Sequence, residues 1–191
     1  MIRIGILGGI GSGKSYIANS FNYPVFNADK EVSKIYKNDK KIFNKLKKIL
    51  PKYICSFPIN KNEITAAILG NKTNLKKIIK IVHVEVRKKM HSFIQRNKKK
   101  KIIILDIPLL LENKINIKND ILIFVYANKS VVKTRLHKRS NFNEKLMTKF
   151  RDIQLPLDYK KKKSKFTINN NFSKKSVKNK VKNILRKILD K

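Results

Sequence analysis

The chain carries a glycine-rich stretch near its start, which reads Gly8-Gly9-Ile10-Gly11-Ser12-Gly13-Lys14-Ser15. This stretch matches the pattern G-x-x-x-x-G-K-[ST] of phosphate-binding loops at every specified position. The apolar run Arg3 to Leu7 precedes it, and Ile17, Ala18 and Phe21 follow at helical spacing. A strand, a glycine turn and a helix N-terminus direct backbone N–H groups towards an anion. The stretch therefore predicts a site for a nucleoside triphosphate with magnesium.

The residue types in this loop suit that chemistry. We expect Lys14 to reach the outer phosphates as a point charge and the Ser15 hydroxyl to ligate magnesium. The alternative is that the glycines only form a turn between a strand and a helix. The ATP-binding residues that we expect here are Gly9, Gly11, Ser12, Gly13, Lys14, Ser15 and Tyr16.

Short aliphatic runs alternate with segments of helical periodicity, which is typical of an α/β fold with a central parallel sheet of about five strands flanked by helices. The expected strands are Arg3–Leu7, Pro24–Phe26, Ile102–Leu105, Ile121–Tyr126 and Phe166–Ile168. About seventy mostly helical residues separate the second run from the third, too many for one crossover. We expect a single domain, residues 1–191. Its parts are a core of about 1–29, 100–131 and 164–191, a helical substrate-binding insertion of about 30–97 and a lid of about 132–163.

The composition is strongly basic, with 47 Lys and Arg against 12 Asp and Glu over 191 residues, a formal charge of +35. Such a charge suits a polyanionic partner. The 40 Lys, 28 Ile and 21 Asn also share A/T-rich codons, so mutational bias explains the excess equally simply. The single cysteine, Cys55, cannot form an intramolecular disulfide and indicates a reducing cytosol. Because no stretch approaches the roughly 20 apolar residues of a membrane span, we expect a cytoplasmic protein.

Two aspartates follow predicted strands directly. Asp106 ends the run Ile102–Leu105, where an acid helps to hold magnesium in phosphate-loop proteins, or caps the following turn. Asp29 follows the second run, at the edge of the sheet where ligands bind. A carboxylate there can accept the proton of an attacking hydroxyl, or it can cap the next helix.

Arginine is scarce, so each arginine that remains is a candidate phosphate ligand. Arg135 and Arg139 share a helical face, and Arg151 lies near Gln154. A mobile segment that carries such forked side chains would close over a nucleotide and exclude water, while the alternative is a solvated helix face. His83, inside a long amphipathic stretch, is by itself more typical of a structural residue.

Four ordered segments resemble the dephospho-coenzyme A kinase family. They are Gly8 to Ser15, Asn27-Ala28-Asp29 (Asp-Ala-Asp in the family), Asp106-Ile107-Pro108-Leu109-Leu110-Leu111-Glu112 (Asp-x-Pro-Leu-Leu-Phe-Glu), and Arg151 to Gln154 with Ile168 to Asn171 (Arg-Ile-x-x-Gln and Ile-x-Asn). The resemblance spans the whole chain and implies the phosphate-loop kinase fold. Asn27 replaces an acid and brings no negative charge to that position.

The resemblance also implies roles for individual residues. Asp29 would be the catalytic base or orienter, acting with Lys14 and with Arg139 as the lid arginine over the ATP phosphates, and Asn170 or Asn171 would lie near the adenine. Ser15 and Asp106 would bind the metal. The implied substrate-binding residues are Asp29, His83, Lys61, Asp106, Pro108 and Leu109.

The implied activity is ATP-dependent phosphorylation of the ribose 3′-hydroxyl of dephospho-coenzyme A, the last step of coenzyme A synthesis. The implied cofactors are ATP and Mg²⁺, and we expect a monomer with small-molecule substrates, without a specific nucleic-acid partner and without a membrane. Two alternatives remain open at this stage. One is a kinase for another small acceptor, such as a nucleoside monophosphate, and the other is a basic ATPase that binds nucleic acid.

Overall fold

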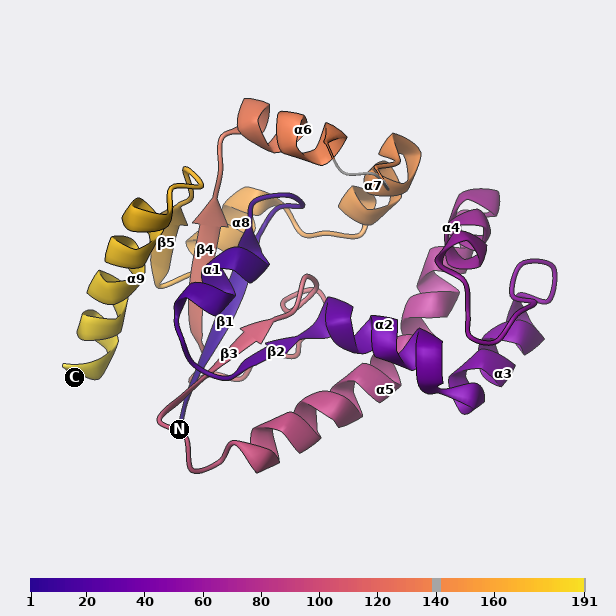
Figure 1. Ribbon diagram of the computed structural model, residues 1–191, viewed down its shortest axis with the longest axis horizontal. Helices are drawn as coiled ribbons and strands as arrows, with labels where there is room; N and C mark the ends of the chain where they lie inside the picture. The colour runs from indigo at the N-terminus through magenta and orange to yellow at the C-terminus, as the bar shows by residue number, and fades with distance from the viewer. Residues whose placement is uncertain (139–141, 191) are drawn as a thin grey trace. The chain divides into compact units, whose positions relative to one another are not determined.

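The computed structural model describes residues 1–138 and 142–190 and divides the chain into two compact units (Figure 1). The first unit contains Met1–Asn27, Arg96–Phe142 and Ile153–Lys191, and the second contains Ala28–Gln95 and Asn143–Asp152. The prediction of one domain with a core, an insertion and a lid remains a prediction.

The first unit is built on the expected parallel sheet. Its strands are β1 (Ile2–Gly8), β2 (Val25–Asn27), β3 (Ile102–Asp106), β4 (Ile121–Tyr126) and β5 (Phe166–Asn169). They lie in the order β2-β3-β1-β4-β5, and every pair of neighbours is parallel. Within the described residues, the predicted α/β class and the expected five parallel strands are confirmed. Because all strands run in one direction, the residues that follow β1, β2 and β3 emerge at the same edge of the sheet.

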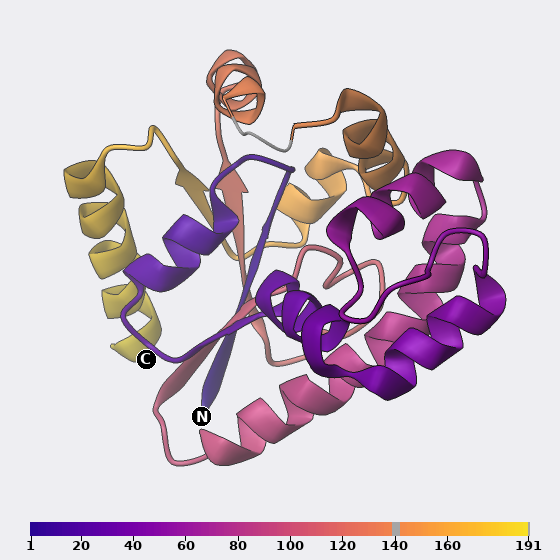
Figure 2. The same cartoon turned by 45° about the vertical axis from the view of Figure 1, so that its right-hand side comes forward.

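The two faces of the sheet are covered by different helices, because successive side chains of a strand point to opposite faces. On one face Ile4 and Ile6, both fully buried, belong to a core cluster with residues of α1 (Lys14–Ser20) and α9 (Lys174–Leu189). Figure 2 shows these two helices side by side, and they contact each other. The short helix α8 (Leu157–Lys162) also packs against the sheet, on β1 and β4.

The remaining elements of the first unit are α6 (Lys129–His137) and the turn that follows β3. We call residues 108–114 the post-β3 turn. Its Leu110 is completely buried against β1, where a Cβ on Gly5 would lie only 2.6 Å from the Leu110 Cδ2 atom. Gly5 therefore allows the post-β3 turn to approach the central strand closely.

The second unit is helical. Its helices are α2 (Ala28–Asn38), α3 (Lys40–Ile49), α4 (Lys61–Gly70), α5 (Asn74–Arg96, of which the last residue falls in the first unit) and α7 (Glu144–Asp152). Buried aliphatic side chains such as Leu46, Ile54 and Ala67 form its core, and α7 packs against α4. Among the described residues, no helix is both long enough and apolar enough to cross a membrane.

Candidate active site

The glycine-rich stretch forms the loop between β1 and α1, at the carboxyl end of the central strand. Gly11 and Gly13 have φ angles of 79° and 88°, in the left-handed region that glycine adopts without strain. The Ser12 N–H donates to the Gly9 carbonyl at 3.3 Å. The local fold that the glycine spacing predicts is therefore present.

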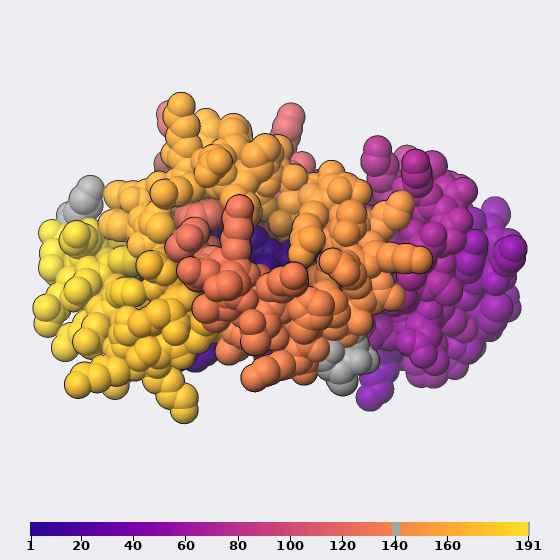
Figure 3. Space-filling model, turned by 90° about the horizontal axis from the view of Figure 1, so that it is seen from above, coloured from indigo at the N-terminus to yellow at the C-terminus, as the bar shows by residue number. Residues whose placement is uncertain are grey.

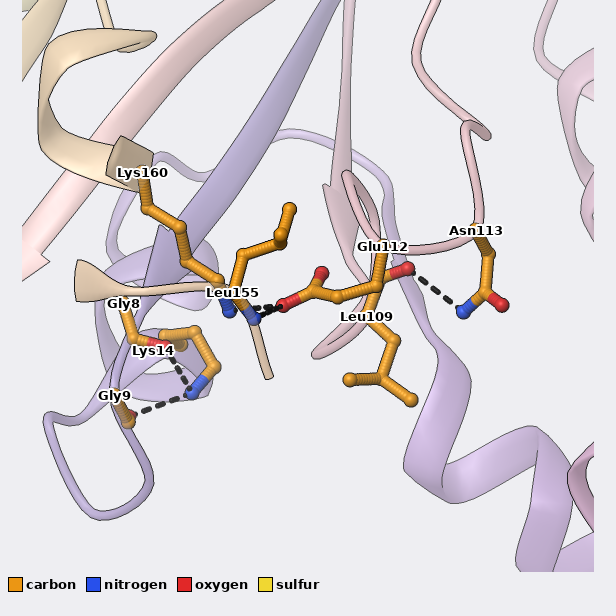
Figure 4. Close-up of polar contacts among 8 residues, drawn as sticks. All are labelled: Gly8, Gly9, Lys14, Leu109, Glu112, Asn113, Leu155 and Lys160. Atoms are coloured by element: carbon orange, nitrogen blue, oxygen red, sulfur yellow. Dashed lines mark hydrogen bonds and ion pairs between the residues drawn. The ribbon is translucent and has the colours of Figure 1, made fainter. Parts of the chain in front are cut away.

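Lys14 places its ammonium group against this loop (Figure 4). The Lys14 Nζ atom donates to the Gly9 carbonyl at 2.8 Å and to the Gly8 carbonyl at 3.2 Å. These bonds bring a positive charge to the loop whose amides are the predicted phosphate ligands. An anionic ligand here would meet both the amides and the ammonium group.

Two side chains at neighbouring strand ends, together with Ser15 of α1, form one hydrogen-bonded cluster. Asn27 and Asp106 are paired in register on β2 and β3, and the Asn27 Nδ2 atom donates to the Asp106 carboxylate. The same amide nitrogen lies 3.3 Å from the Ser15 hydroxyl, which it also contacts as a donor. Asp106 is buried. The cluster brings together the two residues predicted to bind the metal.

The donors of this cluster fit magnesium. Mg²⁺ prefers oxygen ligands and is commonly held by one or two protein groups together with substrate phosphates. The hydroxyl of Ser15 and the carboxylate of Asp106 are such groups, joined through Asn27. Within the described part of the chain, no set of three or more His, Cys, Asp or Glu residues forms a self-sufficient metal site. The Ser15 hydroxyl and the Asp106 carboxylate are therefore oxygen donors of the kind that magnesium prefers.

The end of β5 supports the loop from the other side. Asn170 is buried, and its Nδ2 atom donates to the Ser12 carbonyl at 2.9 Å while its Oδ1 atom accepts the Phe172 N–H at 2.9 Å. Asn171 is exposed, and its Oδ1 atom accepts the Ser173 N–H at 3.3 Å. The two neighbouring asparagines therefore differ in their contacts: the Asn170 side chain is hydrogen-bonded to the loop, and the Asn171 side chain is not.

A stacked pair lies next to this support. The Arg135 guanidinium on α6 is 4.0 Å from the centroid of the Phe172 ring, within the range of a cation–π contact. A Cβ on Gly13 would lie 3.1 Å from the Phe172 ring, so the ring borders the phosphate loop. Figure 3 shows indigo atoms from the start of the chain at the bottom of a hollow beside coral atoms, the colour of α6.

The residues after β3 sit close to this region. Pro108 and Leu109 are half-buried in the post-β3 turn. The Asn113 Nδ2 atom donates to the Leu109 carbonyl at 2.9 Å and closes the turn. At the far end of the turn, Glu112 forms a 2.6 Å ion pair with Lys160 of α8 (Figure 4).

Three of the predicted residues belong to the second unit. Asp29 is exposed in the first turn of α2, and Lys61 is the exposed first residue of α4. His83 is half-buried in α5. Tyr16, in the first unit, is 37% exposed on α1. Arg139 lies outside the described residues.

Sequence reasoning did not find three of the residues around the loop as contributors to a site. Phe172 lies in a connection without a periodic pattern, and Lys160 is one of four consecutive lysines. In the sequence, Glu112 is distinguished only as the last residue of the segment Asp106 to Glu112. The Lys160–Glu112 pair could have been suspected from charged residues at positions that pack in the apolar interior. Those positions can be recognised only when the order of the strands is known.

Comparisons with known proteins find relatives that match nearly the whole chain. A dephospho-CoA kinase of Wolbachia sp. subsp. Brugia malayi (strain TRS) is 37% identical over 187 residues, 95% of each chain. A second one, from Bartonella quintana (strain Toulouse), is 32% identical over 171 residues, 87% of each chain. The crystal structure of TT1252 from Thermus thermophilus superposes with a TM-score of 0.77 at 26% identity, over 97% of each chain.

A further solved structure, a dephospho-CoA kinase from Campylobacter jejuni, shares the fold with a TM-score of 0.64 at 23% identity, over 97% of this chain and 96% of that one. The family model for dephospho-CoA kinase matches residues 2–176. The phosphate loop, the strand-end cluster and this match lead to one conclusion: the chain belongs to the dephospho-CoA kinase family.

Proposed function

We propose that this chain transfers the terminal phosphoryl group of ATP to the ribose 3′-hydroxyl of dephospho-coenzyme A, giving coenzyme A and ADP. This is the reaction for which its family is named and the last step of coenzyme A synthesis. The observation that supports the proposal most strongly is the meeting of the Lys14 loop with the Asn27–Asp106–Ser15 cluster at one edge of the sheet. Phosphoryl transfer needs mainly positioning and neutralisation of charge, and these groups supply both.

On the ATP side, the backbone amides of Gly9, Gly11, Ser12 and Gly13 bind phosphate oxygens, and Lys14 exchanges its carbonyl partners for the outer phosphates. Asn170 acts by holding the loop through the Ser12 carbonyl. We assign the adenine contact to Asn171, because its side chain is exposed. Tyr16 borders the same nucleotide, and Arg139 covers the phosphates as the lid arginine.

Ser15 and Asp106 are the residues that hold Mg²⁺. When bound, the ion neutralises charge on the phosphate oxygens of the nucleotide. Asn27 orients both ligands through its amide. This arrangement leaves a single carboxylate, Asp106, at the metal position among the three side chains.

On the acceptor side, Asp29 accepts the proton of the 3′-hydroxyl and orients it for attack, a role that contributes about 10²- to 10⁴-fold in general. His83 and Lys61 bind dephospho-coenzyme A from the helical insertion, and Pro108 and Leu109 bind it from the post-β3 turn. The lid closes over both substrates and excludes water. We further propose that the enzyme is a cytoplasmic monomer and has no specific nucleic-acid partner.

The direct test is to incubate the protein with ATP, MgCl₂ and dephospho-coenzyme A and to measure coenzyme A by mass spectrometry. We expect coenzyme A and ADP in equal amounts, and no phosphorylation when a nucleoside monophosphate replaces the acceptor. Absence of coenzyme A, together with phosphate release only after RNA or DNA is added, would overturn the proposal.

A further inference from the structure

Lys160 has an unusual environment for a lysine of this chain. Among the described residues it is the one buried lysine, with a relative exposure of 0%, although the chain contains 40 lysines. Its neighbours Lys161 and Lys162 on α8 are exposed. Random enrichment in lysine places these residues where water solvates them, because burying an ammonium ion is costly. The position of Lys160 therefore calls for a specific explanation.

The partner of Lys160 is equally enclosed. The Lys160 Nζ atom lies 2.6 Å from the Glu112 Oε1 atom, and the side chains are 1% and 9% exposed. The same carboxylate oxygen accepts the Leu155 N–H at 3.0 Å, so Glu112 binds α8 and the segment that leads into it (Figure 4). Its second oxygen, Oε2, is buried without a hydrogen-bond partner among the described residues.

Stability does not account for this pair. The desolvation of two buried charges costs several kcal/mol per ion, and apolar side chains of similar volume commonly give equal or greater stability. The Oε2 atom is enclosed as well, and no group of the described chain donates a hydrogen bond to it. An ion pair differs from an apolar contact in its geometric specificity. It fixes the position of the two segments that carry the charges relative to each other.

One of those segments borders the phosphate loop, and the other packs on the strand that leads into the loop. Glu112 lies in the post-β3 turn, which starts two residues after Asp106 and packs on β1 through Leu110. Lys160 lies in α8, whose Leu157 approaches the loop: a Cβ on Gly9 would lie 3.5 Å from both Leu157 methyl groups. The ion pair thus joins the turn that follows Asp106 to the helix whose Leu157 lies beside the start of the loop.

We propose that Lys160 and Glu112 are positioning residues for phosphate binding: their buried ion pair holds α8 against the phosphate loop and the post-β3 turn under Asp106. This inference rests on the proposed function for its catalytic consequence, but its effect on phosphate binding does not depend on the acceptor. Loss of the pair frees Leu157 and Asp106 to shift, and misplacement by about 1 Å can cost on the order of 100-fold in rate.

The decisive variant is the double replacement Lys160→Met with Glu112→Leu, which removes both charges and keeps apolar volume. We expect a folded protein whose melting temperature is at least that of either single variant, since no buried charge loses its partner. We expect its affinity for MgADP, measured by calorimetry, to fall about tenfold or more, with a matching fall in kcat. The exposed neighbour provides a control, because Lys161→Met should change neither quantity.

The result that overturns the proposal is a folded double variant with wild-type MgADP affinity and wild-type kcat, because the pair would then be structural only. If the double variant does not fold, Glu112→Gln combined with Lys160→Met takes its place. Its amide oxygen at position 112 can still accept from the Leu155 N–H and no buried charge is left without a partner, so we expect a folded protein whose MgADP binding is severalfold weaker; unchanged binding refutes the proposal. A wild-type protein that makes no coenzyme A contradicts the proposed function alone, because the MgADP titration still tests the pair.

Discussion

The Asn27 side-chain amide donates a hydrogen bond to the Asp106 carboxylate, at positions that pair in register across β2 and β3. The amide also contacts the Ser15 hydroxyl. An aspartate at position 27 would face Asp106 with a second negative charge instead of a donor, and like charges in direct contact repel each other strongly. Asn27 therefore gives the Asp106 carboxylate a neutral hydrogen-bond donor in place of a second negative charge.

The replacement Asn27→Asp tests this relationship. In EDTA we expect the variant to have a lower melting temperature than the wild type, because the new carboxylate at position 27 then faces the Asp106 carboxylate directly. Addition of MgCl₂ should raise the melting temperature of the variant by more than it raises that of the wild type, since a cation relieves the repulsion. Differential scanning fluorimetry with and without MgCl₂ measures both effects.

A matched control separates charge from lost hydrogen bonds. Asn27→Ala removes both bonds without adding charge, so it should lower the melting temperature by similar amounts in EDTA and in MgCl₂. Equal responses of Asn27→Asp and Asn27→Ala to MgCl₂ would contradict the role assigned to the amide.

Asp29 is the residue on which the proposed proton transfer depends. Asp29→Asn should lower kcat by about 100-fold or more, because an amide cannot accept the hydroxyl proton. Binding of MgATP should change little, since the phosphate loop is untouched. Steady-state kinetics with dephospho-coenzyme A and calorimetry with MgATP measure the two quantities.

The control for Asp29 lies in the same helical turn. Glu31 of α2 pairs with the exposed Lys34 at 2.7 Å, and a surface pair of this kind contributes little. Glu31→Gln should therefore leave kcat unchanged. If Asp29→Asn and Glu31→Gln have the same kcat, Asp29 is not the base.

The two asparagines after β5 should respond differently to replacement. Asn170→Ala removes the bonds to the Ser12 carbonyl and to the Phe172 N–H, and each unmade bond of a buried group costs about 1–3 kcal/mol. We expect a lower melting temperature and a higher KM for ATP. Asn171→Ala should leave the melting temperature near the wild-type value and affect only nucleotide binding. A larger stability loss in Asn171→Ala would reverse the assignment.

The fold was predictable because buried parallel strands have sequences that are unbroken runs of aliphatic residues. Ile121–Tyr126 was predicted with its observed bounds, and Gly8 to Ser15 identified the phosphate loop. Contacts between strands were not predictable in the same way. Asn27 and Asp106 are 79 positions apart, and only the order of β2 and β3 brings them together.

Lys160 shows the second limit of sequence reasoning. It is chemically identical to Lys161, Lys162 and Lys163, and a charge count treats the four residues as one solvated run. Only the packing of α8 on β1 and β4 buries one of them opposite Glu112. Because lysine is so abundant in this chain, its presence at a position does not indicate a function. Lys160, which is buried with a defined partner in the described core, therefore could not be recognised from the sequence.

Asp120 predicts a pH dependence of stability. Burial raises the pKa of its carboxyl above the ordinary value of 3.8, although the Ile117 N–H and the Arg3 guanidinium act in the opposite direction. The folded state then binds the proton more tightly than the unfolded state does. The contribution of Asp120 to the free energy of unfolding is therefore complete below pH 3.8 and is lost as the pH rises through the folded-state pKa.

The replacement Asp120→Asn isolates this contribution. The other acidic residues are common to both proteins, so their effects cancel in the difference. Chemical denaturation from pH 3.5 to 7 should show the wild type losing stability relative to the variant as the pH rises. A difference that stays constant with pH would show that the contacts with Arg3 and the Ile117 N–H balance burial, and a difference that favours the wild type more at high pH would show that they outweigh it.

The excess of lysine leads to the last prediction. Lys178 and Lys182 are exposed on α9, whose apolar side packs in the core of the first unit. If most of the charge reflects composition, replacing both residues by Gln should leave kcat within about twofold of the wild-type value, because salt screens the field of solvent-exposed charges. Retention on heparin should fall, because that binding depends on total charge. A large loss of kcat/KM at low salt that disappears at high salt would instead show that these lysines steer the anionic substrates.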